Sequence, residues 1–143
     1  MIFLDSDAVI AFLRGNPGIA SVFAEYNTSI FAISAPVLYE IYYGFYFPPL
    51  SKKFQKDLIF LQKLQKEEQK LVQLLNDIPV FDLNLPAIKK AAEISAQLDA
   101  KGMGVGKMDV LIASIILING HNEILTNNVS HYENIPDLKI HQY

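Results

Sequence analysis

The sequence predicts an α/β domain built on a central parallel sheet of four or five strands. Short apolar runs, typical of buried strands, alternate with longer segments in which apolar residues recur every three or four positions, as they do on one face of a helix. A chain of 143 residues, 51% of them hydrophobic, is long enough for a sizeable core. We therefore expect a single domain over residues 1–143.

The first part of the chain predicts two strands separated by two short helices. Residues 1–5 are apolar up to Asp5 and are typical of a buried strand. A polar residue can cap a helix over 7–14, and a Gly-Asn-Pro sequence ends that helix and opens a second one over 17–26. Residues 29–33 are rich in β-branched and aromatic side chains, which indicates the second strand.

The middle of the chain predicts two further helices. Pro36 lies in the first turn of a helix that we expect to end near Gly44 or Phe47, because Pro48 and the proline after it lack the backbone N–H that a helix needs. Leucine and phenylalanine side chains then recur at spacings of three and four, and they predict a long amphipathic helix over 51–76.

The last part of the chain returns to alternating strands and helices. Residues 78–81 are predicted as a short strand and 84–101 as an amphipathic helix. Residues 108–119 are apolar on nearly every side, so this helix should be central and buried. Residues 123–126 predict a fourth strand and 138–140 a fifth one at an edge of the sheet.

Three acidic residues lie among apolar neighbours. Asp5 ends the first predicted strand, Glu40 lies in an apolar helix, and Asp109 opens the central helix. Burying a carboxylate is costly unless a partner compensates it, and Mg²⁺ or Mn²⁺, which prefer oxygen ligands, could compensate all three. Ligands bind outside the carboxyl ends of parallel strands, and Asp5 and Thr126 both lie at such ends. Alternatively, Asp5 and Asp109 are only helix caps.

The charge pattern and composition exclude several classes of site. The chain has no cysteine, no phosphate-binding Gly-Lys-Ser/Thr loop and no pair of histidines at zinc-site spacing, so thiolate, P-loop and zinc chemistry are not expected. The net charge is −3, yet six of the twelve basic residues lie in 51–70. They form either a solvated helix face or a surface that contacts phosphates. The candidates for contact with a nucleic-acid backbone are Arg14, Lys52 and Lys53.

Four segments together resemble the motifs of PIN-domain ribonucleases, in order and over almost the whole chain. The resemblance within this family is greatest to VapC-type toxins of toxin–antitoxin pairs. The four segments are Leu4-Asp5-Ser6-Asp7-Ala8-Val9-Ile10, Leu38-Tyr39-Glu40-Ile41-Tyr42-Tyr43-Gly44, Met108-Asp109-Val110-Leu111-Ile112-Ala113 and Leu125-Thr126-Asn127-Asn128-Val129-Ser130-His131-Tyr132.

This resemblance implies a three-layer α/β/α fold and a Mg²⁺- or Mn²⁺-dependent endoribonuclease. It implies that Asp5, Glu40 and Asp109 form the metal site. It also implies a homodimer that a small antitoxin inhibits. The absence of a secretory signal and of an apolar stretch long enough for a membrane favours a cytoplasmic protein without membrane contact.

The fourth motif departs from the family pattern. Many members carry an Asp where this chain has Asn128, which brings an oxygen but no charge, so a tightly held second metal is not expected. Asn128 is expected to complete the catalytic site. Ser6, Thr126 and Asn127 are expected to hydrogen-bond Asp5 or a metal-bound water, and Asp7 is a weaker candidate.

Aromatic residues are concentrated in one short segment. Six lie within 39–47, and they cannot all face inward from one helix, because successive residues point about 100° apart. We expect the remainder to form a surface for the antitoxin or a second protomer; base stacking is the alternative. The residues expected on this surface are Tyr42, Tyr43, Phe45 and Tyr46.

Two other functions are consistent with the sequence. The uncharged Asn128 permits a catalytically silent PIN-like module that binds nucleic acid or protein. The same acidic centre could also serve a DNA-directed nuclease or a phosphatase.

Overall fold

Five short parallel strands form the centre of the structure, a computed structural model that describes residues 1–143. Their spatial order is β3-β2-β1-β4-β5. Ile2 lies opposite Phe31 on one neighbour of β1, and Phe3 lies opposite Ile124 on the other. The predicted parallel sheet is therefore confirmed, with the last strand at an edge. The strands are β1 (Ile2–Leu4), β2 (Phe31–Ser34), β3 (Val80–Phe81), β4 (Glu123–Leu125) and β5 (Lys139–His141).

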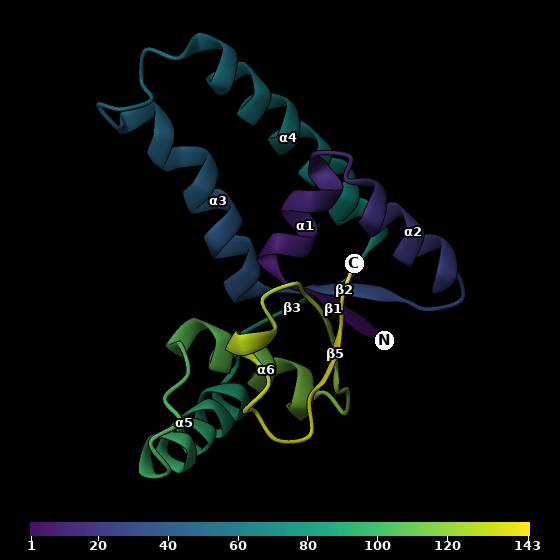
Figure 1. The fold of residues 1–143 in the computed structure, drawn as a ribbon, viewed down its shortest axis with the longest axis vertical. Coiled ribbons are helices and arrows are strands. Elements are labelled where there is room, and N and C mark those ends of the chain that lie inside the picture. Colours follow the sequence, from purple (N-terminus) through teal and green to yellow (C-terminus); the bar gives the residue numbers. More distant parts are fainter.

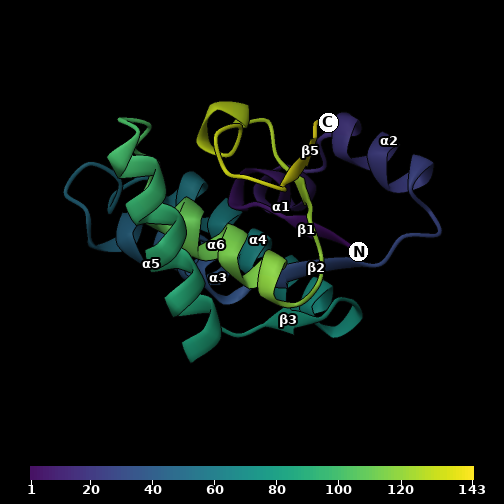
Figure 2. The same ribbon diagram turned by 90° about the horizontal axis from the view of Figure 1, so that it is seen from below.

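Helices cover both faces of this sheet, which gives the three layers that the PIN resemblance implies. One face carries α1 (Ser6–Leu13), α2 (Pro17–Glu25) and part of α4 (Leu58–Asp77). The other carries α5 (Leu85–Ala100) and α6 (Lys107–Ile118), as Figures 1 and 2 show.

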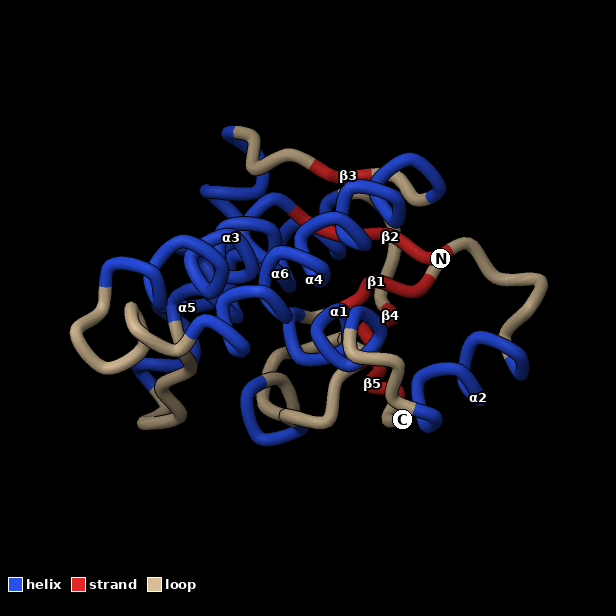
Figure 3. The backbone as a smooth tube through the Cα atoms, turned by 90° about the horizontal axis from the view of Figure 1, so that it is seen from above, coloured by secondary structure: helices blue, strands red, loops and turns tan.

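A helical hairpin projects upward from the sheet in Figure 1, and Figure 3 looks down onto it. The ends of its two helices correct two predictions. The helix α3 (Ala35–Leu50) does not end before Pro48, because both prolines lie in its last turn, where they remove only two backbone hydrogen bonds and keep a helical φ. The helix predicted over 51–76 begins only at Leu58, because Asp57 caps it by accepting a hydrogen bond from the N–H of Phe60 at 3.0 Å. Turns connect the two helices.

The core is one cluster of 29 buried apolar residues between the layers. Phe3 on β1 and Leu71 on α4 are fully buried. The helix α6 is buried over most of its length, as its apolar sequence predicts. None of the helices combines the length and the apolar character that crossing a membrane requires.

Candidate functional site

Asp5 lies where β1 ends and α1 begins. Its carboxylate accepts a hydrogen bond from the N–H of Ser6 at 2.8 Å and therefore caps α1. The Thr126 hydroxyl, which follows β4, donates to Asp5 Oδ2 at 2.9 Å. The carboxyl ends of these adjacent strands thus meet at one edge of the sheet, as the strand pattern predicts. This edge, with the acidic residues on it, is called the acidic rim below.

Asp5 is only 3% exposed, and this burial perturbs the ionisation of its carboxyl group. Burial raises the pKa of Asp5 from 3.8 to about 6. The hydrogen bond from the Ser6 N–H opposes this rise, and the negative charge of Asp7 adds to it. No lysine or arginine pairs with Asp5, so in the absence of a cation its negative charge is poorly compensated.

Glu40 and Asp109 lie on the same rim, one on α3 and the other in the first turn of α6. Burial is the main reason that both pKa values lie above the ordinary range. The charge of Asp109 also raises the pKa of Glu40, which shows that the two carboxylates are close. His131 Nδ1 lies 3.4 Å from Asp109 Oδ2, and its influence offsets part of the rise in the pKa of both acids.

A glycine leaves the room that the Asp109 carboxylate occupies. Gly106 precedes α6 with an ordinary negative φ. A Cβ at position 106 would collide with Asp109 Oδ2. Glycine therefore suits position 106 because it has no side chain, and not because its backbone adopts an unusual conformation.

Tyr132 is the residue of the site that the sequence analysis missed. Its side chain is fully buried, and its hydroxyl donates to Asp5 Oδ1 at 3.0 Å. Burial and the charges of all three acids raise the pKa of Tyr132 far above its ordinary value. The hydroxyl therefore contacts Asp5 directly and lies within electrostatic range of Glu40 and Asp109. Its position in the fourth motif was the only sequence signal, and an aromatic residue there is equally consistent with simple core packing.

Asp7, a weaker candidate from the sequence, makes several hydrogen-bond contacts with residues of the rim. It accepts a hydrogen bond from the N–H of Asn127 at 2.8 Å, and its Oδ1 lies 3.1 Å from the Thr126 hydroxyl, whose single proton it shares with Asp5. The Tyr143 hydroxyl is 3.4 Å from Asp7 Oδ2. Asp7 therefore ties the start of α1 to the segment after β4.

The two asparagines of the fourth motif have different surroundings. The side chain of Asn127 bonds the backbone of Tyr143, at 3.0 and 3.1 Å, so it faces the last residue rather than Asp5. The Asn127 side chain therefore does not bond Asp5 in this structure, and its bond to a metal-bound water stays a prediction. Asn128 is exposed. Its backbone N–H donates to the Thr126 hydroxyl at 3.0 Å, and its carbonyl oxygen accepts from the N–H of His131 at 3.0 Å, but its side chain makes no hydrogen bond. Its amide stays available to a ligand.

The chemistry of these side chains fits a hard divalent cation. The rim offers carboxylate and hydroxyl oxygens and no thiolate, the set that Mg²⁺ and Mn²⁺ prefer. Ser34, at the carboxyl end of β2, has the one buried side-chain polar atom without a hydrogen-bond partner. However, no three His, Asp or Glu side chains are arranged to ligate one ion directly. Direct ligation by Asp5, Glu40 and Asp109 together would require their side chains to move, or water to bridge one of them.

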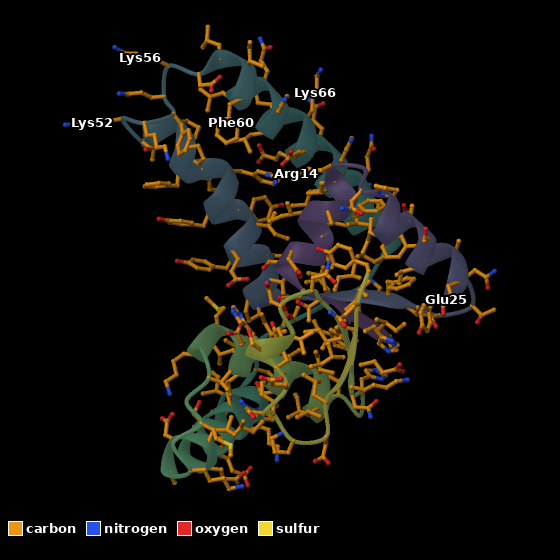
Figure 4. All side chains as sticks on the ribbon, viewed as in Figure 1. Arg14, Glu25, Lys52, Lys56, Phe60 and Lys66 are labelled. Atoms are coloured by element: carbon orange, nitrogen blue, oxygen red, sulfur yellow. The ribbon has the colours of Figure 1, made fainter.

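The basic candidates for RNA contact lie at two separate places. Lys52 and Lys53 lie in the turn between α3 and α4, far along the hairpin from Arg14 (Figure 4). Arg14 follows α1, and its Nε lies 3.1 Å from Glu67 Oε1.

The aromatic segment of α3 is largely exposed. Tyr43 and Tyr46 are 55% and 58% exposed, and Tyr42 is half-buried and stacks on Tyr46 with ring centroids 5.7 Å apart. Phe45, expected on the same surface, is only 7% exposed. It is buried because its position on the helix turns it toward α4. A groove of about 400 Å³ between α3 and α4 begins beside it.

The fold and the rim define an α/β protein with one buried and two half-buried carboxylates at the carboxyl-end edge of its parallel sheet. Residues 2–134 match the model of the PIN domain family, and the chain belongs to this family.

Relatives and solved structures agree with this assignment. The chain is 29% identical over 107 residues to "Ribonuclease VapC2" of Rickettsia felis, which covers 75% of this chain and 69% of that protein. It is similar to the crystal structure of VapBC2 from Rickettsia felis bound to a promoter DNA fragment, with a TM-score of 0.77 and 23% identity over 99% of this chain and 98% of the other. DNA-bound VapBC from Salmonella typhimurium gives a TM-score of 0.75 and 26% identity over 99% and 98% of the two chains.

Proposed function

We propose that this chain is a metal-dependent endoribonuclease that acts in the cytoplasm as the toxin of a type II toxin–antitoxin pair. The observation that carries the proposal is the buried Asp5 carboxylate, which accepts from the hydroxyls of Thr126 and Tyr132. Glu40 and Asp109 lie close enough for their charges to raise the pKa of Tyr132, and burial raises the pKa of all three acids. Perturbed acids in one place are typical of sites that hold cations and move protons. The name of the Rickettsia felis relative, a ribonuclease, supports the same interpretation.

In the proposed mechanism, Asp5 and Asp109 would hold Mg²⁺ or Mn²⁺ directly, and Glu40 would hold it directly or through water. Such an ion, when bound, polarises a phosphoryl oxygen of the substrate and lowers the pKa of a water molecule. The chain's own contribution is orientation. Two hydroxyl donors, Thr126 and Tyr132, fix the Asp5 carboxylate at 2.9 and 3.0 Å.

The remaining rim residues have separate proposed roles. Glu40, whose pKa is raised, orients the attacking water and accepts its proton. Asn128 completes the site through its free amide oxygen. Ser6 lies beside Glu40, and its hydroxyl lowers the pKa of that acid, so we assign it a positioning role.

The decisive experiment compares cleavage of RNA, DNA and a small phosphate ester by wild type and Asp109→Asn. We expect cleavage of RNA alone, its loss in chelator and its loss in Asp109→Asn. Asp77→Asn is the matched control, because Asp77 is exposed and precedes β3, at the opposite edge of the sheet. Equal RNA cleavage by Asp109→Asn and wild type at saturating Mg²⁺ would reject the assignment.

A catalytically silent binding module is the second candidate. It is favoured by the lack of three side chains ready to ligate one ion. Calorimetric titration of the purified protein with Mn²⁺ distinguishes the two functions when it is combined with the cleavage assay. Metal binding without cleavage of any substrate favours the silent module.

We further propose that the exposed aromatic face of α3 binds the antitoxin or a second protomer. The face contains Tyr42, Tyr43 and Tyr46, and large exposed apolar patches usually mark partner sites. Light scattering of Tyr43→Ala/Tyr46→Ala should show a lower dimer fraction, or co-purification should show weaker antitoxin capture. Ile30→Ala, an exposed apolar change outside α3, is the control. If the double variant dimerises and captures the antitoxin as well as wild type does, this proposal is contradicted.

A further inference from the structure

A basic pocket lies between the end of α1 and one face of α4, away from the acidic rim. Its volume is about 520 Å³. Four cationic side chains line it, and Glu67 is its only acid. Figure 4 shows Arg14 and Lys66 from the two helices that form it. The cationic residues are Arg14, Lys63, Lys66 and Lys70.

The cations of α4 form a row. Lys63, Lys66 and Lys70 are spaced three and four residues apart on one helical face, which corresponds to rises of about 4.5 and 6 Å along the axis. A row of like charges at this spacing repels itself, and a linear polyanion lying along it relieves the repulsion.

Internal contacts fix the pocket without neutralising it. Lys70 donates from Nζ to the carbonyl oxygen of Leu13 at 2.8 Å, so its charge stays at the junction of the helices. Arg14 meets Glu67 only through Nε, which leaves both terminal nitrogens of the guanidinium for a ligand. The guanidinium fork is suited to two oxygens of one phosphate.

The helix α1 connects this pocket to the acidic rim. It begins at Ser6, beside Asp5, and ends at Leu13, on the pocket wall. Eight helical residues span about 12 Å, which an extended RNA strand covers in a few nucleotides. The pocket is therefore within reach of the backbone of a strand whose scissile phosphate lies at the rim.

We propose that this basic pocket binds backbone phosphates of the RNA substrate a few nucleotides from the cleavage point. The inference rests on the proposed ribonuclease function. The row of lysines and the direct path along α1 favour RNA over an acidic protein segment, because a polynucleotide presents regularly spaced charges to both places at once. Contacts of this kind position the strand and carry no sequence information.

The test measures binding of Lys63→Ala/Lys66→Ala to an unstructured, fluorescently labelled oligoribonucleotide, with chelator present to prevent cleavage. Both lysines are exposed, and alanine favours helices, so α4 should stay folded. We expect affinity to fall by about threefold to tenfold. The slope of log affinity against log salt should decrease by about 0.7 for each phosphate that the variant no longer neutralises. The matched control is Lys89→Ala/Lys101→Ala, which removes two exposed charges from and beside α5, on the other face of the sheet.

The outcomes separate this proposal from the nuclease assignment. Equal RNA affinity and salt slope in the double variant and the control would overturn the pocket proposal, even if wild type cleaves the RNA in Mg²⁺. Reduced affinity in the double variant alone supports the pocket, even if wild type cleaves nothing. If Lys63→Ala/Lys66→Ala binds a polyglutamate peptide more weakly than wild type does but binds RNA equally well, the pocket suits an acidic protein partner. That result would overturn the proposal.

Discussion

Replacing Asp5 by asparagine should make the metal-free protein more stable at neutral pH while it removes metal binding. Burial raises the pKa of Asp5 from 3.8 to about 6, so its ionised form is disfavoured in the folded state. Asparagine has the same shape and no charge to desolvate. Its oxygen can accept the hydrogen bonds of Ser6 and Tyr132, and its amide group can donate to the Thr126 hydroxyl.

The magnitude follows from the shift in pKa. A carboxyl group with a raised pKa in the folded state favours folding below its unfolded pKa, and this contribution is lost as the pH rises through the folded pKa. Between pH 4 and pH 6 wild type should therefore lose up to about 3 kcal/mol that Asp5→Asn retains. For a chain of this length, that corresponds to a melting temperature up to about 10 °C higher for the variant at pH 7.

The assay is thermal unfolding followed by circular dichroism in chelator, at several pH values from 4 to 8. The difference between Asp5→Asn and wild type should be small at pH 4 and largest above pH 6. Added Mg²⁺ should stabilise wild type and leave Asp5→Asn unchanged. Asp77→Asn is the control and should follow wild type at each pH. The reasoning is refuted if Asp5→Asn in chelator melts below wild type at pH 7, or if the difference between them does not depend on pH.

Three further changes test the surroundings of the rim and the attachment of α4. Tyr132→Phe removes one donor to Asp5, so the pKa of Asp5 should rise further by NMR titration and stability should fall by about 1 kcal/mol; an unchanged titration would contradict the hydrogen bond. Gly106→Ala should displace the Asp109 carboxylate and weaken Mn²⁺ binding in calorimetry by about tenfold with little change in melting temperature, whereas wild-type affinity would show that the carboxylate tolerates a Cβ there. Leu71→Ala empties a fully buried position and should cost about 2–5 kcal/mol in urea unfolding; a loss below about 1 kcal/mol would show that α4 is not anchored there.

The sheet and the position of the acids could be predicted because they depend on local patterns. An apolar run such as residues 1–5 signals a buried parallel strand by its composition alone. Once the strands are placed, the topology rule brings Asp5 and Thr126 to one edge without any knowledge of packing. The bond between them, at 2.9 Å, is consistent with that rule.

The remaining details depend on tertiary contacts that no local pattern encodes. Pro48 is a strong stop signal, yet it lies buried inside α3, which ends only at Leu50. Tyr132 differs from an ordinary core aromatic only through its hydroxyl, and that hydroxyl matters only once Asp5 is known to lie beside it. The Asn127 side chain likewise bonds the backbone of Tyr143. That residue lies beside Asn127 only because β5 pairs with β4.

The brevity of the outermost strands has a consequence for how copies of this chain can associate. The strands β3 and β5 contain two and three residues, so each border of the sheet presents few free backbone N–H and C=O groups. A neighbouring chain could form only a few main-chain hydrogen bonds there. We therefore expect any dimer to form through side chains on the helices, with the two sheets remaining separate.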